Sequence, residues 1–176
     1  MNMISARPSL EKAGLDNLLS DIRVAARRPL EERPGAVAAA IAPYLGDACL
    51  LDGKDCPSNP DRYVRHLLDE GEGYAVVALV WRPGQMSPVH SHHTWCALGV
   101  HRGTLTEHFF APGTDAGALP RPKAAHLRAE GDTSHGPGCP DLIHRIANCC
   151  AETAVSIHVY GVPYAEFADG VNRILA

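Results

Sequence analysis

The spacing of hydrophobic residues changes near residue 60 of the chain. Before that point apolar side chains recur at helical spacing, which predicts two amphipathic helices. The second helix is expected to begin at Pro34 and to end before Gly46, with Pro43 weakening its last turn. Basic residues at 27 and 28 suit the end of the first helix. The apolar positions are Leu15, Leu18, Leu19 and Ile22 in the first helix, and Val37, Ala40, Ile41, Tyr44 and Leu45 in the second.

After residue 60 the pattern consists of short apolar runs separated by Gly, Pro and Asp, which is typical of an all-β sandwich or barrel. The acidic and Gly-rich segment 69–73 predicts a hairpin turn, and segment 111–123, with three Pro and two Gly, predicts a loop. We therefore expect one domain over 1–176, with a mainly helical flank at 1–58 and a β-barrel core at 60–165. The predicted strands cover 74–81, 95–100, 105–110, 142–147 and 154–160.

Composition is that of an ordinary globular protein and excludes several classes. Of 176 residues, 45% are apolar and 20% are charged, which fits one domain with a sizeable core. The net charge of -4 argues against a surface that binds nucleic acid through phosphates. The apolar runs are too short for a transmembrane helix, and residues 1–8 lack the apolar stretch of a secretory signal. We expect no nucleic acid partner, no membrane partner and a cytoplasmic location.

Ten His and six Cys stand out among these residues. The cysteines contain no CxxC pair and no regular disulfide framework, which favours a reducing compartment. A zinc site made by Cys139, Cys149 and Cys150 is disfavoured because the usual ligand spacing is missing. The placement of the histidines is therefore the better indication of function.

His90-Ser91-His92 is the strongest local signal. Residues i and i+2 of a strand point to one face, so both imidazoles would form half of a metal site inside a barrel. The alternative is a polar loop that follows Pro88.

The wider spacing resembles the two motifs of the cupin superfamily over about residues 60–165. The usual Glu position of the first motif holds Cys96, and the second motif is matched by His144 and Asn148. The resemblance implies a cupin β-barrel (jelly roll) whose metal ligands are His90, His92 and His144, without a carboxylate. The positions that match the first motif are Gly84, His90, His92 and Gly103.

Two further motifs are similar to those of the cysteine dioxygenase family. One is Arg62-Tyr63-Val64-Arg65, and the other is Ser156-Ile157-His158-Val159-Tyr160. The resemblance implies that Fe(II) is bound by the three histidines and that Arg65 binds the substrate carboxylate, with Tyr63 nearby. It also implies a hydrogen-bonded relay that faces the iron. The relay residues are Ser156, His158 and Tyr160, which alternate and so share one strand face.

Each of these residues also has a plain structural interpretation. Tyr63 and Arg65 fit the surface of a helix that begins after Asn59-Pro60-Asp61, and the relay residues fit the polar face of an edge strand. Cys96 occupies the position of a cysteine that some family members cross-link to the relay tyrosine, here Tyr160. The alternative for Cys96 is a small buried thiol.

The resemblance implies a thiol dioxygenase that adds both atoms of O2 to the sulfur of a small mercapto-carboxylate and yields a sulfinic acid. Segment 80–103 looks like bacterial members that use 3-mercaptopropionate, whereas Arg65 is typical of members that use cysteine. Cysteine is favoured, with 3-mercaptopropionate and mercaptosuccinate left open. The competing functions are another metal-dependent cupin enzyme and a non-catalytic metal-binding cupin sensor.

Overall fold

The computed structural model describes residues 11–115 and 117–176, so the prediction for residues 1–8 lies outside the described part. Two helices, α1 (Glu11–Ala25) and α2 (Arg33–Ile41), precede the strands. A 3-10 turn, η1 (Ala42–Tyr44), replaces the predicted last turn of the second helix, because Pro43 has no N–H to continue the α pattern. No helix of this part is long and apolar enough to cross a membrane. The strands are β1 (Val64–Gly71), β2 (Tyr74–Trp81), β3 (His90–His92), β4 (Cys96–Arg102), β5 (Thr104–Ala111), β6 (Arg121–Ala129), β7 (Thr133–Gly136), β8 (Cys139–Ala147), β9 (Ala154–Tyr160) and β10 (Asn172–Ile174), with η2 (Tyr164–Glu166) and α3 (Phe167–Gly170) between the last two.

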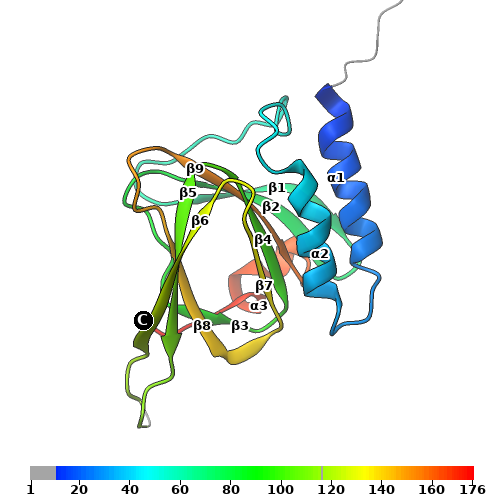
Figure 1. Cartoon of the computed structure of the whole chain (residues 1–176). Coiled ribbons are helices and arrows are strands. Elements are labelled where there is room, and N and C mark those ends of the chain that lie inside the picture. Colours follow the sequence, from blue (N-terminus) through cyan, green and yellow to red (C-terminus); the bar gives the residue numbers. More distant parts are fainter. Residues whose placement is uncertain (1–10, 116) are drawn as a thin grey trace, which may run out of the picture.

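The strands form two five-stranded antiparallel sheets that enclose a barrel (Figure 1). One sheet has the order β1-β2-β9-β4-β7 and the other has the order β10-β3-β8-β5-β6. This is the double-stranded β-helix of the cupin fold, and it confirms the predicted all-β jelly roll with an N-terminal helical flank. Gly84 and Gly103, from the first cupin motif, both have positive φ values, of 81° and 78°, which residues with a Cβ rarely adopt.

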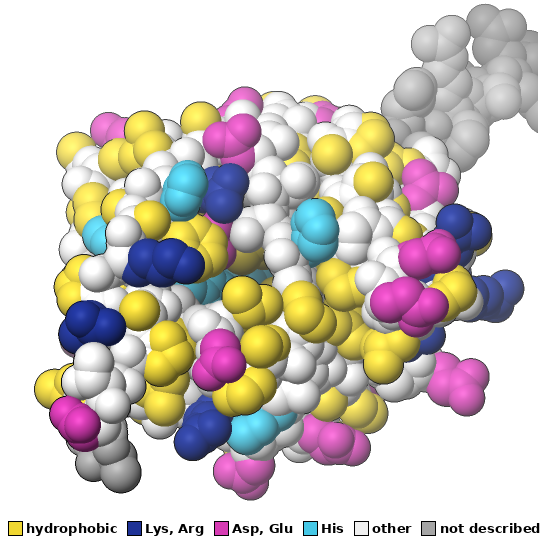
Figure 2. Space-filling view, turned by 60° about the horizontal axis from the view of Figure 1, so that its bottom comes forward, with side chains coloured by type: hydrophobic (Ala, Val, Ile, Leu, Met, Phe, Trp, Pro, Cys, Tyr) yellow, Lys and Arg dark blue, Asp and Glu magenta, His cyan; other side chains and the backbone are white. Residues whose placement is uncertain are grey.

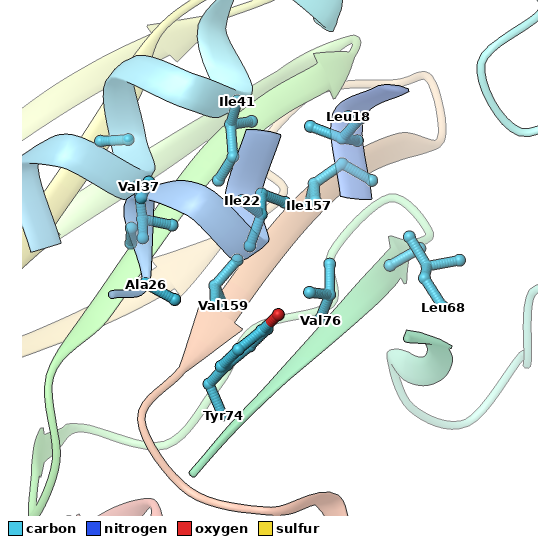
Figure 3. Close-up of a cluster of buried hydrophobic side chains, with 14 of the residues drawn as sticks. Leu18, Ile22, Ala26, Val37, Ile41, Leu68, Tyr74, Val76, Ile157 and Val159 are labelled. Atoms are coloured by element: carbon cyan, nitrogen blue, oxygen red, sulfur yellow. The ribbon is translucent and has the colours of Figure 1, made fainter. Parts of the chain in front are cut away.

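Both helices pack on the outer face of the first sheet (Figures 1 and 3). Their predicted apolar positions Leu18, Ile22 and Ile41 are fully buried there. Strand β2 alternates between two cores, since Val76 packs under the helices and Val77 packs inside the barrel. Burial on both faces explains why 74–81 is apolar without interruption.

Strand β9 uses the same alternation to place polar groups inside the barrel. Ile157 and Val159 belong to the core under the helices (Figure 3). Ser156, His158 and Tyr160 therefore project from the opposite face, into the barrel, where all three are buried. The central position of β9, between β2 and β4, contradicts the interpretation of these residues as an exposed edge strand.

The segment 111–123 departs from the predicted loop. Strand β6 begins at Arg121 and lies at the edge of its sheet, where it pairs with β5 only. An edge strand accommodates Pro122, and its almost entirely exposed side chains carry no apolar alternation that would reveal it. Of the predicted turn at 69–73, only residues 72–73 form the turn between β1 and β2, and residues 69–71 are the paired end of β1.

Candidate metal centre

Two adjacent strands bring three histidines together. His90 and His92 lie on β3, and His144 on β8 is the direct cross-strand partner of His90. The His92 Nε2 atom lies 3.0 Å from Nε2 of His90 and 3.4 Å from Nε2 of His144. One nitrogen from each ring lies within 4.8 Å of the others. The two histidines of the HxH motif thus lie in a strand, and the alternative of a polar loop is wrong.

Burial keeps these rings in the form that binds metal ions. Loss of hydration, and then the neighbouring His144, lower the pKa of His90 to about 4 and that of His92 to about 2. The two rings are therefore neutral at pH 7. Nδ1 of His90 lies 2.9 Å from the Pro88 carbonyl oxygen, which can only accept, so this nitrogen carries the proton and Nε2 is left as the ligand atom. The donor set fits a divalent transition metal ion.

A buried carboxylate lies behind the third histidine. Oε1 of Glu107 accepts a hydrogen bond from His144 Nδ1 at 2.9 Å, and Oε2 accepts two from the Arg128 guanidinium, at 3.0 and 2.8 Å. Burial raises the pKa of Glu107, but its contacts with His144 and Arg128 outweigh this effect, and the pKa lies below its usual value. The sequence analysis missed Glu107. The sequence feature that could have revealed it is the position of this carboxylate between Leu105 and Phe109, two apolar residues on the same face of a predicted strand.

A continuous hydrogen-bonded chain runs along β9. Ser156 Oγ lies 2.9 Å from His158 Nε2, and His158 Nδ1 lies 3.0 Å from the Tyr160 hydroxyl. Trp81 Nε1–H donates to Ser156 Oγ at 2.9 Å, a partner that the sequence analysis did not include. The arrangement in which Ser156 donates to His158 and His158 donates to Tyr160 satisfies the fully buried Ser156 hydroxyl, whose oxygen already accepts from Trp81. It leaves the Tyr160 proton free to point into the barrel.

The relay groups are held in their uncharged forms. Burial, and then the charge of Arg65, lower the pKa of His158 to about 3. Burial, and then the neighbouring Cys96, raise the pKa of Tyr160 well above 10. At neutral pH the imidazole is therefore unprotonated and the phenol keeps its proton.

Tyr63 immediately precedes β1 and Arg65 is the second residue of this strand. Both line the same small cavity as the three histidines and Tyr160, which contradicts their interpretation as helical surface residues. The Tyr63 ring stacks on Trp81 with 4.3 Å between ring centres. The Arg65 guanidinium lies 5.6 Å from the centre of the Tyr63 ring and 6.0 Å from that of Phe167. No carboxylate of the described residues forms an ion pair with Arg65, and its buried Nε has no hydrogen-bond partner.

Cys96 on β4 is the direct cross-strand partner of Tyr160 on β9, so the two side chains project to the same face. The thiol is buried, and burial raises its pKa far above the usual value. Cys96 is therefore a protonated thiol, which is a poor nucleophile and a poor metal ligand.

A second, larger cavity of about 350 Å³ also reaches His92 and His144. Its wall includes Glu107, Arg128 and Leu142. Figure 2 shows histidine side chains deep in a hollow bordered by basic and hydrophobic residues. His92 and His144 line both cavities and are half-buried, whereas His90 is buried. His93, which was not predicted as a ligand, is exposed and outside the cluster.

Comparison with known proteins gives a consistent family match. The family model described as "Cysteine dioxygenase type I" matches residues 55–169. A curated relative, "Cysteine dioxygenase type 1" from Danio rerio, is 32% identical over 107 residues, which are 58% of this chain and 53% of the relative. The chain therefore spans about half the length of that relative.

The similarity to solved structures is weaker. A cupin superfamily protein from Desulfitobacterium hafniense has a TM-score of 0.46 and 10% identity, with 61% of this chain and 84% of that chain covered. A double-stranded β-helix protein from Klebsiella pneumoniae has a TM-score of 0.48 and 17% identity, with 68% and 90% covered.

Proposed function

The chain belongs to the cysteine dioxygenase type I family, and from this premise we propose that it is an iron(II)-dependent thiol dioxygenase. The reaction joins both atoms of O2 to the sulfur of a small mercapto-carboxylate, so that one thiol and one O2 become one sulfinic acid. His90, His92 and His144 would hold iron(II), which would supply the redox chemistry of this addition. Three neutral nitrogen ligands leave further coordination positions open.

The observation that carries the proposal is a single small cavity lined by the three histidines, Arg65 and Tyr160. Arg65 binds the carboxylate, because its planar guanidinium matches a carboxylate and its charge has no acidic partner among the described residues. The guanidinium lies close to the rings of Tyr63 and Phe167, and cation–π contacts with them help to hold it in place. The thiol is thereby oriented with its sulfur toward the histidines.

Tyr160 donates a hydrogen bond to the reacting group. Its raised pKa keeps the proton on the phenol, and the hydrogen bond from His158 fixes the direction in which the proton points. Ser156 and His158 are almost fully buried, so water is excluded from this part of the relay. We further propose a thioether between Cys96 and Tyr160, supported by their cross-strand pairing. Its C–S bond replaces the S–H bond of Cys96 and one C–H bond of the Tyr160 ring, and O2, the co-substrate of the proposed reaction, would accept the two electrons and two protons.

The cavity favours a thiol with one carboxylate and one hydrogen-bond donor. Arg65 is the only Lys or Arg among its described lining residues, which disfavours the second carboxylate of mercaptosuccinate. Asn172 also lines the cavity, and its buried Oδ1 has no hydrogen-bond partner. The amino group of cysteine would satisfy this oxygen, whereas 3-mercaptopropionate has no such donor. Cysteine therefore remains the favoured substrate.

The test is O2 consumption by the iron(II)-loaded protein with cysteine, 3-mercaptopropionate, mercaptosuccinate and cysteamine, with the sulfinic acid quantified in parallel. We expect the fastest consumption with cysteine, equal amounts of O2 consumed and sulfinate formed, and weak activity with cysteamine, which has no carboxylate. Absence of consumption with all four thiols would refute the proposal and favour another cupin enzyme or a metal-binding sensor.

A further inference from the structure

Glu107 is a buried charge that neither substrate binding nor the relay uses. Its exposed fraction is 1%, and an ionised carboxylate in such a place is unfavourable unless it is paired and hydrogen-bonded. The two oxygens are used differently. Oε2 accepts both hydrogen bonds from Arg128, while Oε1 accepts from His144 Nδ1 at 2.9 Å and from the Ser134 hydroxyl at 3.2 Å.

The sheet register explains how Glu107 reaches His144. On β5, Phe109 lies directly opposite His144 of β8, and Glu107 lies two residues earlier on the same face. Glu107 and His144 are therefore diagonal cross-strand neighbours, a separation that long side chains span. Arg128 reaches the carboxylate from β6, on the other side of β5, and Ser134 reaches it from β7 in the opposite sheet. Three strands besides its own thus fix the position of the carboxylate.

The carboxylate determines which nitrogen of His144 is available to a metal ion. An ionised carboxylate only accepts hydrogen bonds, so His144 Nδ1 must donate, and the lone pair is left on Nε2 beside the other two histidines. His90 has the corresponding contact to a backbone carbonyl, which is neutral. Glu107 therefore adds negative charge to one ligand in particular.

We propose that Glu107 is a positioning residue of the metal centre. It orients His144 and makes the imidazole a stronger electron-pair donor to the metal ion. Arg128 and Ser134 hold the carboxylate in place. The inference rests on the metal site of the proposed function but does not depend on thiol oxidation. Outer carboxylate partners of this kind typically change metal affinity by about 10- to 100-fold.

The test compares iron(II) affinity, measured anaerobically by competition with a chelator, in the wild type, Glu107→Gln and Glu72→Gln. Gln keeps an acceptor oxygen and removes the charge, and Glu72 is an exposed carboxylate in the β1–β2 turn. We expect affinity to fall about 10- to 100-fold in Glu107→Gln and to stay unchanged in Glu72→Gln. Wild-type affinity in a folded Glu107→Gln protein would overturn the proposal.

The iron(III)/iron(II) midpoint potential separates this role from a merely structural one. Loss of the anion in Glu107→Gln should raise the potential, because the charge favours iron(III). Arg128→Gln should lower it, because the cation that neutralises Glu107 is removed, and this variant serves as the test if Glu107→Gln does not fold. Shifts of the same sign, or no shift, would overturn the proposal. Neither the affinity nor the potential measurement uses a thiol. If both give the expected results but the wild-type protein oxidises no thiol, only the proposed function is refuted.

Discussion

Replacement of Arg65 by Ala tests the proposed recognition of the substrate carboxylate. The side chain lines the same cavity as the three histidines, close to the Tyr63 and Phe167 rings, and no described acidic group pairs with it. A hydrogen bond to a charged group is worth about 1.5–3 kcal/mol, which corresponds to about 10- to 150-fold in kcat/KM. We expect a loss of this size for cysteine and 3-mercaptopropionate, mostly as a raised KM. Cysteamine, which has no carboxylate, should lose little.

The assay is the initial rate of O2 consumption over a range of thiol concentrations, with iron content measured for each variant. Arg62→Ala is the matched control, because Arg62 is an exposed arginine three residues earlier in the chain. Its kinetics and those of the wild type should agree. Unchanged KM values for both mercapto-carboxylates in iron-loaded Arg65→Ala would refute the assigned role, as would an equal loss with cysteamine.

Three other predictions concern the metal, the relay and acid stability. His144→Ala should lose iron, and full iron retention, measured by elemental analysis of purified protein, would contradict its assignment as a ligand. A thioether between Cys96 and Tyr160 removes two hydrogens, so the intact mass of active protein should fall accordingly; an unshifted mass would exclude it. Unfolding of the metal-free protein by urea should become easier as the pH falls below about 6.5, by about 1.4 kcal/mol per pH unit for each buried histidine. The pKa of His90 is about 4 and that of His158 is about 3 in the folded protein, so the unfolded chain takes up protons first as the pH falls. A free energy of unfolding that does not change between about pH 7 and pH 5 would contradict this prediction.

Elements with a regular apolar pattern were predictable from the sequence, and exposed or short elements were not. The helical spacing of apolar residues such as Leu18 and Ile22 predicted the first helix, and the uninterrupted apolar segment 74–81 predicted β2. In contrast, β6 is almost entirely exposed and begins in a Pro-containing segment, so no side-chain alternation marks it. The three-residue strands β3 and β10 are too short to show a period.

The candidate site was predictable where chemistry and strand alternation agree. Ser156, His158 and Tyr160 alternate along one strand, and the structure places them in one hydrogen-bonded chain. Glu107 and Asn172 were not found, because only the sheet register brings each of them to the histidines; Asn172 on β10 lies opposite His92 on β3. Glu107 contacts His144 across 37 residues, and only the register of β5 against β8 brings them together.

The measurement that tests the central claim most directly is mass analysis of the product formed from cysteine and isotopically labelled O2. A thiol dioxygenase must place both labelled oxygen atoms in the sulfinic acid, and we predict this doubly labelled product from the iron(II)-loaded wild type and its near absence from His144→Ala. A product that carries one labelled oxygen or none, or cystine in place of a sulfinic acid, would contradict the account.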